Sequence, residues 1–272
     1  MVSSPRIASA SWPVTETLLA LGVTPMATAD IPGYDKWVVE PPIPDGVKDL
    51  GLRNQPHLEL LALDPPDLLL TSDLFSGDNA RLSRITPVKV MNNFATGQPY
   101  LEATIAMTRE IARLSGTQQQ AETLVSSTLQ HLADTRDRLS GNPRELYVIR
   151  LIDERHVQVF GEHSMLEAVF DQTALTNAWQ GPTNSWGFAQ VPISLLAENP
   201  QAEIVIIAPI DQQVLRQLPT NEIWRRLPAV REGRVTITDP IWLYSGLRSF
   251  QRLLEQLEAH LSTPDVQQAD AR

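Results

Sequence analysis

Five aromatic side chains lie outside the periodic segments that predict core strands and helices: Trp37, Phe75, Trp186, Trp242 and Tyr244. Rings in connecting segments give a large contact area at a small entropic cost, which suits a partly apolar ligand. Arg53, in a turn, offers a fork of N–H donors to the oxygen atoms of such a ligand. These residue types predict the chemistry of a binding site.

The sequence lacks the common catalytic and metal-binding motifs. It has no GxSxG elbow, no HExxH pair, no P-loop, and no GxGxxG turn between a strand and a helix. The histidines are scattered without the spacing of metal ligands: His57, His131, His156, His163 and His260. The absence of cysteine excludes thiol catalysis, thiolate metal sites and disulfides. We therefore predict that the protein is not an enzyme and has no metal site or cofactor of its own.

A long helix is predicted over Thr117–Leu139. Thr117 and Gln120 have the spacing of a capping box, and Gly141 followed by Pro143 ends the helical pattern. Between them an apolar and threonine stripe recurs every three or four residues, as on one face of a helix. Such a helix is roughly 34 Å long at ~1.5 Å per residue, so we interpret it as a rigid bridge between two lobes.

The chain on either side of this helix alternates short strands with helices. In the first half, strands are predicted at residues 6–11, 24–29, 67–71 and 88–91, and residues 31–46 are predicted as loop because they contain four prolines. In the second half, strands are predicted at residues 145–152, 156–161 and 234–238 and in the apolar run that follows Asn199-Pro200, with helices at 163–175, 222–227 and 247–260. We expect an N-terminal α/β lobe at residues 1–114, a connecting helix at 115–141 and a C-terminal α/β lobe at 142–272, with the ligand cleft between the lobes.

The composition restricts the classes of partner. The 272 residues carry a formal net charge of -10, which repels nucleic acid and anionic membranes, so no nucleic-acid partner is expected. There is no run of about 18 apolar residues that would span a bilayer. Residues 1–11 contain neither an apolar core nor a cleavage site, so we expect either a cytosolic protein or one whose secretion signal has been removed.

Several stretches carry a resemblance to a known family. They are LLALGVTP, KWVVEPPIPD, DLGLRNQPHLELL, NAWQGPTNSWG and PIWLYSG, which are distributed over nearly the whole chain. The sequence resembles the ferric-hydroxamate siderophore-binding proteins of the helical-backbone, or class III, periplasmic family. This resemblance implies an α/β fold of two lobes with mostly parallel central sheets, joined by a single long α-helix. It also implies a monomer in the periplasm that captures an Fe(III)-hydroxamate siderophore and delivers it to an inner-membrane ABC permease.

The resemblance assigns roles to individual residues. The arginine that contacts the hydroxamate in this family matches Arg53, and the tryptophans of the cleft match Trp37, Trp186 and Trp242. The tyrosine of the last loop matches Tyr244. Because the iron arrives inside the siderophore, the family's site needs no protein ligand to the metal.

The sequence departs from the family's pattern at two points. Phe75 stands where the family has a tyrosine after the central N-lobe strand, so the ring is kept and a hydroxyl is lost. The glutamates that dock the permease in the wider family match Ala80 and Ser194 here. Asp78 and Glu198 lie nearby, and we predict them as substitutes in docking.

Three other functions compete with this prediction. A haem or corrinoid carrier of the same fold would use Tyr34, Tyr244 or His57 as an axial ligand. An α/β-hydrolase-like enzyme would use Ser245 with a distant histidine, although no elbow motif surrounds that serine. A cytosolic two-lobed subunit that assembles with partner proteins is compatible with the acidic composition.

Overall fold

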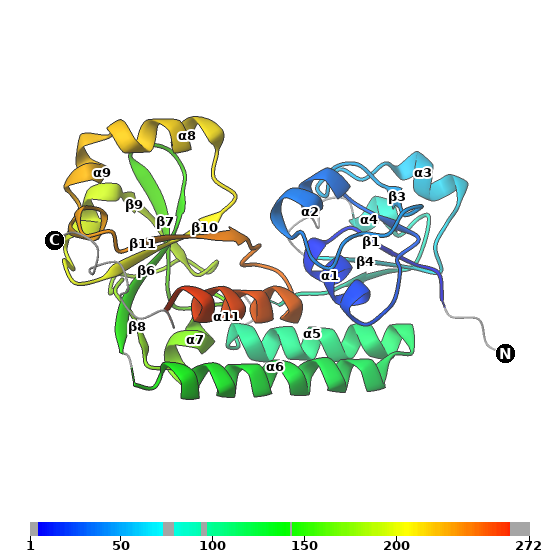
Figure 1. The fold of residues 1–272 in the computed structure, drawn as a ribbon. Helices are drawn as coiled ribbons and strands as arrows, with labels where there is room; N and C mark the ends of the chain where they lie inside the picture. Colours follow the sequence, from blue (N-terminus) through cyan, green and yellow to red (C-terminus); the bar gives the residue numbers. More distant parts are fainter. Residues whose placement is uncertain (1–4, 73–78, 94–96, 142, 262–272) are drawn as a thin grey trace. The chain divides into compact units, whose positions relative to one another are not determined.

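The protein forms two compact units in the computed structural model, which describes residues 5–72, 79–93, 97–141 and 143–261 (Figure 1). Unit 1 contains the described chain up to Thr128 together with Trp242–Phe250. Unit 2 contains Leu129–Ile241 and the described chain from Gln251 onward. Each unit is an α/β structure around a mostly parallel sheet, which confirms the predicted fold class.

Unit 1 is built on a parallel sheet in the order β3-β2-β1-β4-β5. Its strands are β1 (Ile7–Ser9), β2 (Ala27–Thr28), β3 (Lys48–Asp49), β4 (Leu68–Thr71) and β5 (Val88–Val90). Side chains alternate across it: Ile7 and Leu70 pack with one hydrophobic cluster, and Ala8 and Leu69 with another. This alternation follows from the two-residue period of a strand and explains why these strands are apolar on both faces.

The helices that lie wholly within the described part of unit 1 are α1 (Trp12–Ala20), α2 (Ile31–Trp37), α3 (Leu58–Leu63), α4 (Asn79–Leu82) and α5 (Tyr100–Ser115). The helix α2 corrects the prediction of loop at 31–46. Pro32 lies at the start of this helix, where the missing N–H has no partner to lose, and the side chain of Asp30 accepts a bond from the N–H of Gly33. The proline therefore lies in the first turn of this helix.

The predicted long helix is confirmed as α6 (Gln118–Leu139). Thr128, Leu132, Thr135 and Leu139 of its predicted stripe are buried. The boundary between the units falls within this helix. It also falls within the last helix, α11 (Leu247–Leu261), and between Ile241 and Trp242. The segment after Ile241 therefore belongs to unit 1, although the strand before it belongs to unit 2.

Unit 2 has a sheet in the order β11-β10-β6-β7-β9, and β8 pairs with β6. The strands are β6 (Arg144–Leu151), β7 (His156–Phe160), β8 (Leu175–Asn177), β9 (Phe188–Pro192), β10 (Glu203–Ala208) and β11 (Val235–Pro240). Strand β7 runs antiparallel to β6 and β9, whereas β8, β10 and β11 are parallel to their neighbours. Shorter helices complete the unit: α7 (Glu167–Gln172), η2 (Ile193–Ala197), α8 (Gln212–Gln217), η3 (Leu218–Thr220), α9 (Glu222–Arg226) and α10 (Pro228–Arg231).

The short strand β8 was not predicted. Residues 163–175 were predicted as one helix, but the helix α7 occupies only Glu167–Gln172. Thr173 has an extended backbone with φ -122° and ψ 178°, and Leu175 begins the strand. Pairing with the first residues of β6 thus overrides the helical pattern at this end.

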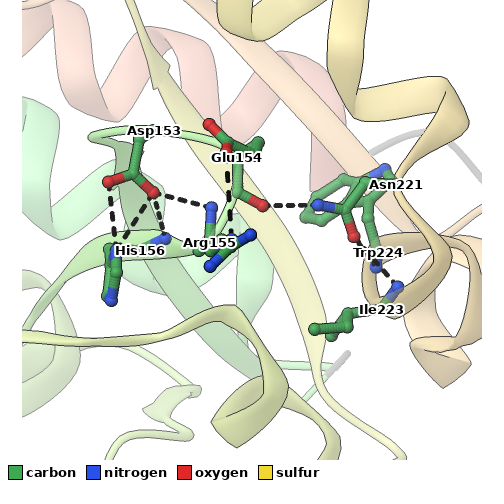
Figure 2. A network of polar contacts seen from close by, with 7 residues as sticks. All are labelled: Asp153, Glu154, Arg155, His156, Asn221, Ile223 and Trp224. Carbon is green, nitrogen blue, oxygen red and sulfur yellow. Dashed lines mark hydrogen bonds and ion pairs between the residues drawn. The ribbon is translucent and has the colours of Figure 1, made fainter.

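A polar network fixes the turn between β6 and β7 (Figure 2). The Asp153 carboxylate accepts the backbone N–H groups of Arg155 and His156, each at 2.7 Å, and these bonds lower the pKa of Asp153. Asn221 caps α9 through its side-chain oxygen, and its amide nitrogen donates to the Glu154 carbonyl at 2.5 Å. The network joins α9 to this turn and leaves its charged side chains at the surface.

Candidate functional site

Arg53 and four aromatic rings come together in unit 1. We call this set the Arg53 cluster: Arg53, Trp12, Trp37, Trp242 and Tyr244. Four of its members were predicted as site residues, and Trp12 was not. The cluster unites residues from the first quarter of the chain with residues near its end.

The carboxyl ends of parallel strands position the first part of the cluster. Trp12 begins α1 shortly after β1, Asp30 follows β2, and Arg53 follows β3. These three strands are neighbours in the sheet, so the segments that leave them meet at one edge. Trp37 ends α2, the helix that Asp30 caps.

The Arg53 guanidinium lies over an indole ring. Its Cζ is 3.3 Å from the centroid of the Trp12 ring and 5.7 Å from that of Trp242. Its Nε is 3.6 Å from Oδ2 of Asp30, and the side chain is 21% exposed. A guanidinium that stacks on a ring in this way is oriented by the cation–π attraction and keeps its N–H donors in the plane of the fork.

Burial and the charge of Asp30 shift the pKa of Arg53 in opposite directions. Burial lowers the pKa of Arg53 to about 10, and the nearby Asp30 carboxylate raises it in part. The group is therefore protonated at neutral pH and presents a positive charge in a partly desolvated position. Such a charge bonds an anionic or partly negative oxygen more strongly than a fully hydrated one would.

Asp30 organises the base of the cluster. Its backbone is left-handed, with φ 57°, and its carbonyl accepts the Trp12 indole N–H at 3.3 Å. Gly33 packs against both residues, because a Cβ at this position would lie 2.4 Å from the Trp12 ring and 2.5 Å from the Asp30 carboxylate. Only glycine allows this approach, so the position of Trp12 depends on the first turn of α2.

Trp242 is the centre of the aromatic contacts. Its ring centroid lies 5.2 Å from Trp12, 5.5 Å from Trp37 and 5.2 Å from Tyr244, each in an edge-to-face arrangement. Edge-to-face pairs at these distances are favourable beyond the burial of their area. The rings thus form a continuous aromatic wall beside the Arg53 charge.

A cavity of about 600 Å³ lies in unit 1, and its lining includes Asp30, the ion-pair partner of Arg53, but no residue of the Arg53 cluster itself. Asp30 and Gly51 contribute to its lining, together with His57, Glu59 and Arg81. The volume falls within the range of ligand pockets, which is about 300–1,000 Å³. The cavity beside Asp30 is therefore large enough for an organic ligand.

Trp186 and Glu198 are the predicted site residues that belong to unit 2. Trp186 is partly exposed in the turn before β9, where its N–H donates to Oδ1 of Asn184 at 2.9 Å. Gly187 has φ +77°, and a Cβ there would lie 2.4 Å from the Ser164 nitrogen, so the turn requires glycine. Glu198 is exposed at the end of η2. Phe75 and Asp78 lie outside the described residues.

The residues of the competing functions have other partners. The Tyr34 side chain is buried, and its hydroxyl donates to the Pro41 carbonyl at 2.9 Å. His57 lies exposed before α3, with its ring against Gly51. The Ser245 hydroxyl is buried and donates to the Glu16 carboxylate. Within the described part of the chain, no group of three acidic or histidine side chains is arranged to hold a metal ion.

Comparison with known proteins points to one group of transport proteins. The sequence matches the periplasmic binding protein family over residues 7–241. It is 34% identical to the iron(3+)-hydroxamate-binding protein FhuD of Escherichia coli over 254 residues, which cover 93% of this chain and 86% of that protein. It is 22% identical to a putative ABC transporter substrate-binding lipoprotein, YhfQ, of Bacillus subtilis, over 90% of this chain and 80% of that protein.

Solved structures agree with this similarity. The siderophore-binding protein FhuD of Vibrio cholerae, crystallised with Fe³⁺-Desferal, superposes with a TM-score of 0.88 at 27% identity. That match covers 96% of this chain and 99% of that one. The petrobactin-binding protein YclQ of Bacillus subtilis has the same fold, with a TM-score of 0.80 at 18% identity over 96% and 94% of the two chains. No helix in the described ranges combines the length and apolarity needed to cross a membrane.

Proposed function

The chain belongs to the periplasmic binding protein family, and on that premise we propose that it binds Fe(III)-hydroxamate siderophores for an ABC importer. The FhuD relatives support the ligand class, because one is named for ferric hydroxamate and the other was crystallised with Fe³⁺-Desferal. Members of this family are transport components without an enzymatic activity of their own.

The observation that carries the proposal is the Arg53 guanidinium, which lies against Trp12 and within 5.7 Å of the Trp242 ring centroid. The oxygens of an iron-bound hydroxamate carry partial negative charge, and each charge-assisted bond from Arg53 is worth about 1.5–3 kcal/mol. The aromatic wall offers apolar contact to the organic framework of the chelate. In this proposal the siderophore supplies all the ligands to its iron, and the protein recognises the chelate from outside.

We extend the proposal to transport. The bound chelate would be delivered in the periplasm to an inner-membrane permease, with Glu198 and Asp78 as docking residues. The exposed position of Glu198 at the end of η2 supports its part in this step. The Arg53 cluster lies in unit 1, so capture and docking can be tested by different substitutions.

Quenching of tryptophan fluorescence tests the ligand class directly, because Arg53 lies against two of the rings. The protein would be titrated with ferrichrome, ferrioxamine B, the iron-free forms of both, a ferric catecholate and haemin. We expect saturable quenching by the ferric hydroxamates and weaker binding of the iron-free forms. Binding of haemin with a shifted Soret band, together with no response to either ferric hydroxamate, would contradict the proposal.

A further inference from the structure

A fully buried glutamate lies on α1, the helix that begins with Trp12, and nothing in the proposed binding chemistry uses it. Glu16 belongs to α1 and is 0% exposed. Its carboxylate accepts bonds from the Ser245 hydroxyl, from the Ser249 hydroxyl at 2.6 Å and from the Ser249 backbone N–H at 2.9 Å. Burial raises the pKa of Glu16, and the bonds from Ser245 and Ser249 lower it in part. A carboxyl group in such a place is costly unless its partners are fixed.

Ser245 is also held through its carbonyl. Asn93 donates to that oxygen from Nδ2 at 2.6 Å, and the Tyr100 hydroxyl donates to it at 2.7 Å. The Asn93 amide lies 3.0 Å from the Tyr100 hydroxyl, so the two donors support one another. All these residues belong to unit 1 and are buried.

The close approach of this segment depends on Gly246. A Cβ at Gly246 would lie 2.9 Å from Oε1 of Glu16 and 2.9 Å from the Thr17 hydroxyl. The backbone after Ser245 can therefore press against α1 only because this residue has no side chain. Three elements, α1, α5 and the segment after β5, thus fix the backbone at Ser245.

The hydrogen bonds at Ser245 matter for the site because two rings of the Arg53 cluster, Trp242 and Tyr244, lie immediately before this residue in the chain. Trp242 and Tyr244 follow β11, a strand of the unit 2 sheet, yet their ring contacts are to residues of unit 1. Edge-to-face ring contacts are individually weak, so they alone hold a chain segment poorly. The buried hydrogen bonds of Ser245 with Glu16, Asn93 and Tyr100 hold this segment in place.

We propose that Glu16 is a positioning residue for ligand binding, which holds the Trp242–Ser245 segment so that Trp242 stays against Trp12 and Arg53. This inference rests on the proposed function for its effect on ligand affinity. The effect of Glu16 on the arrangement of the rings is independent of the proposed function, and it can be measured without a ligand.

The test compares Glu16→Ala and Glu16→Gln with Thr108→Val. Thr108 is equally buried in unit 1, but its hydroxyl bonds only within its own helix, to the Thr104 carbonyl at 2.8 Å. Near-UV circular dichroism reports the coupling between the Trp12 and Trp242 rings. Fluorescence titration with ferrioxamine B gives the Kd of each variant.

We expect Glu16→Ala to change the near-UV spectrum and to weaken binding about tenfold, which corresponds to ~1.4 kcal/mol. Glu16→Gln keeps the shape of the side chain and one oxygen acceptor, so we expect its near-UV spectrum and its Kd to lie between those of Glu16→Ala and the wild type. Thr108→Val should lower only the thermal midpoint. If Glu16→Ala fails to fold, Ser249→Ala removes one of the same bonds and should give the same two changes in smaller measure.

A Glu16→Ala variant with a wild-type near-UV spectrum or a wild-type Kd would overturn the inference. In the background Trp242→Phe, the spectral effect of Glu16→Ala should disappear; if it persists, the signal does not come from this segment and the inference is wrong. A wild-type protein that binds no ferric hydroxamate would instead contradict the proposed function, and the ligand-free spectra would still decide whether Glu16 holds the rings.

Discussion

The candidate binding residues of the two units are held in different ways. In unit 1, the Arg53 cluster is assembled from distant parts of the chain by sheet order, ring contacts and the buried bonds of Glu16. In unit 2, Trp186 lies in a short turn fixed by Asn184 and Gly187, close to it in sequence. Substitutions of the aromatic rings in the cluster should therefore affect stability as well as affinity, whereas a substitution at Trp186 should affect affinity alone.

The charge of Arg53 gives the largest expected effect on affinity. Arg53→Ala removes charge-assisted bonds worth about 1.5–3 kcal/mol, so we expect the Kd for ferrichrome or ferrioxamine B to rise about 10- to 150-fold. The thermal midpoint should change little, because the side chain is partly exposed and its ion pair with Asp30 is long, at 3.6 Å. Isothermal titration and thermal unfolding measure the two effects.

Two further arginine variants control this prediction. Arg109→Ala removes an exposed arginine of unit 1 that pairs with Glu122, and it should leave the Kd unchanged. Arg53→Lys keeps the charge but loses the planar fork, so it should recover only part of the affinity. If Arg53→Ala binds ferric hydroxamates like the wild type, the assignment of Arg53 is wrong.

Trp242→Ala should damage affinity and stability together. The variant loses contacts with three rings, each worth about 0.5–1.5 kcal/mol. We expect a rise in Kd of about tenfold and a loss of about 2–4 kcal/mol in the free energy of unfolding, measured by denaturant titration. Lost affinity at wild-type stability would show that the ring does not support the cluster.

Trp186→Ala should lower ligand affinity without lowering stability. The side chain is partly exposed and its turn is fixed by backbone bonds to Asn184, so the free energy of unfolding should stay within about 0.5 kcal/mol of wild type. If the ring contacts the chelate as proposed, the Kd should rise about three- to tenfold. A loss of stability as large as that of Trp242→Ala would remove the contrast between the units.

Glu198→Ala should have the smallest effect on the isolated protein. Glu198 is exposed and lies outside the Arg53 cluster, so both Kd and unfolding should match the wild type. The expected change is in delivery, measured as reduced stimulation of the permease ATPase in proteoliposomes. Undiminished stimulation would remove Glu198 from the docking surface.

Local patterns in the sequence predicted much of the fold. The apolar run of β4 and the apolar stripe of α6 are patterns of residues close together in the sequence, and the structure has both elements where they were predicted. The helix α2 was missed because prolines were taken as breakers, although Pro32 lies at a helix start where proline is tolerated. Strand β8 was missed because its partner β6 is distant in sequence.

The candidate site was predicted in part, and the missing pieces depend on tertiary contacts. Trp12 was not predicted as a site residue, because its contact with Arg53 follows from the order β3-β2-β1, which is not encoded in spacing. The link from Glu16 to Ser245 spans most of the chain. One signal was available: a glutamate inside the otherwise apolar and threonine-rich segment of α1 requires a buried polar partner.

In the proposed mode of binding, Arg53 and its surrounding rings recognise an iron that is already fully chelated. X-ray absorption at the iron edge, recorded for ferrioxamine B free in solution and bound to the protein, tests this claim most directly. We expect the same set of iron–oxygen distances in both spectra. A new protein ligand in the iron shell, or the loss of a hydroxamate oxygen from it, would contradict the account.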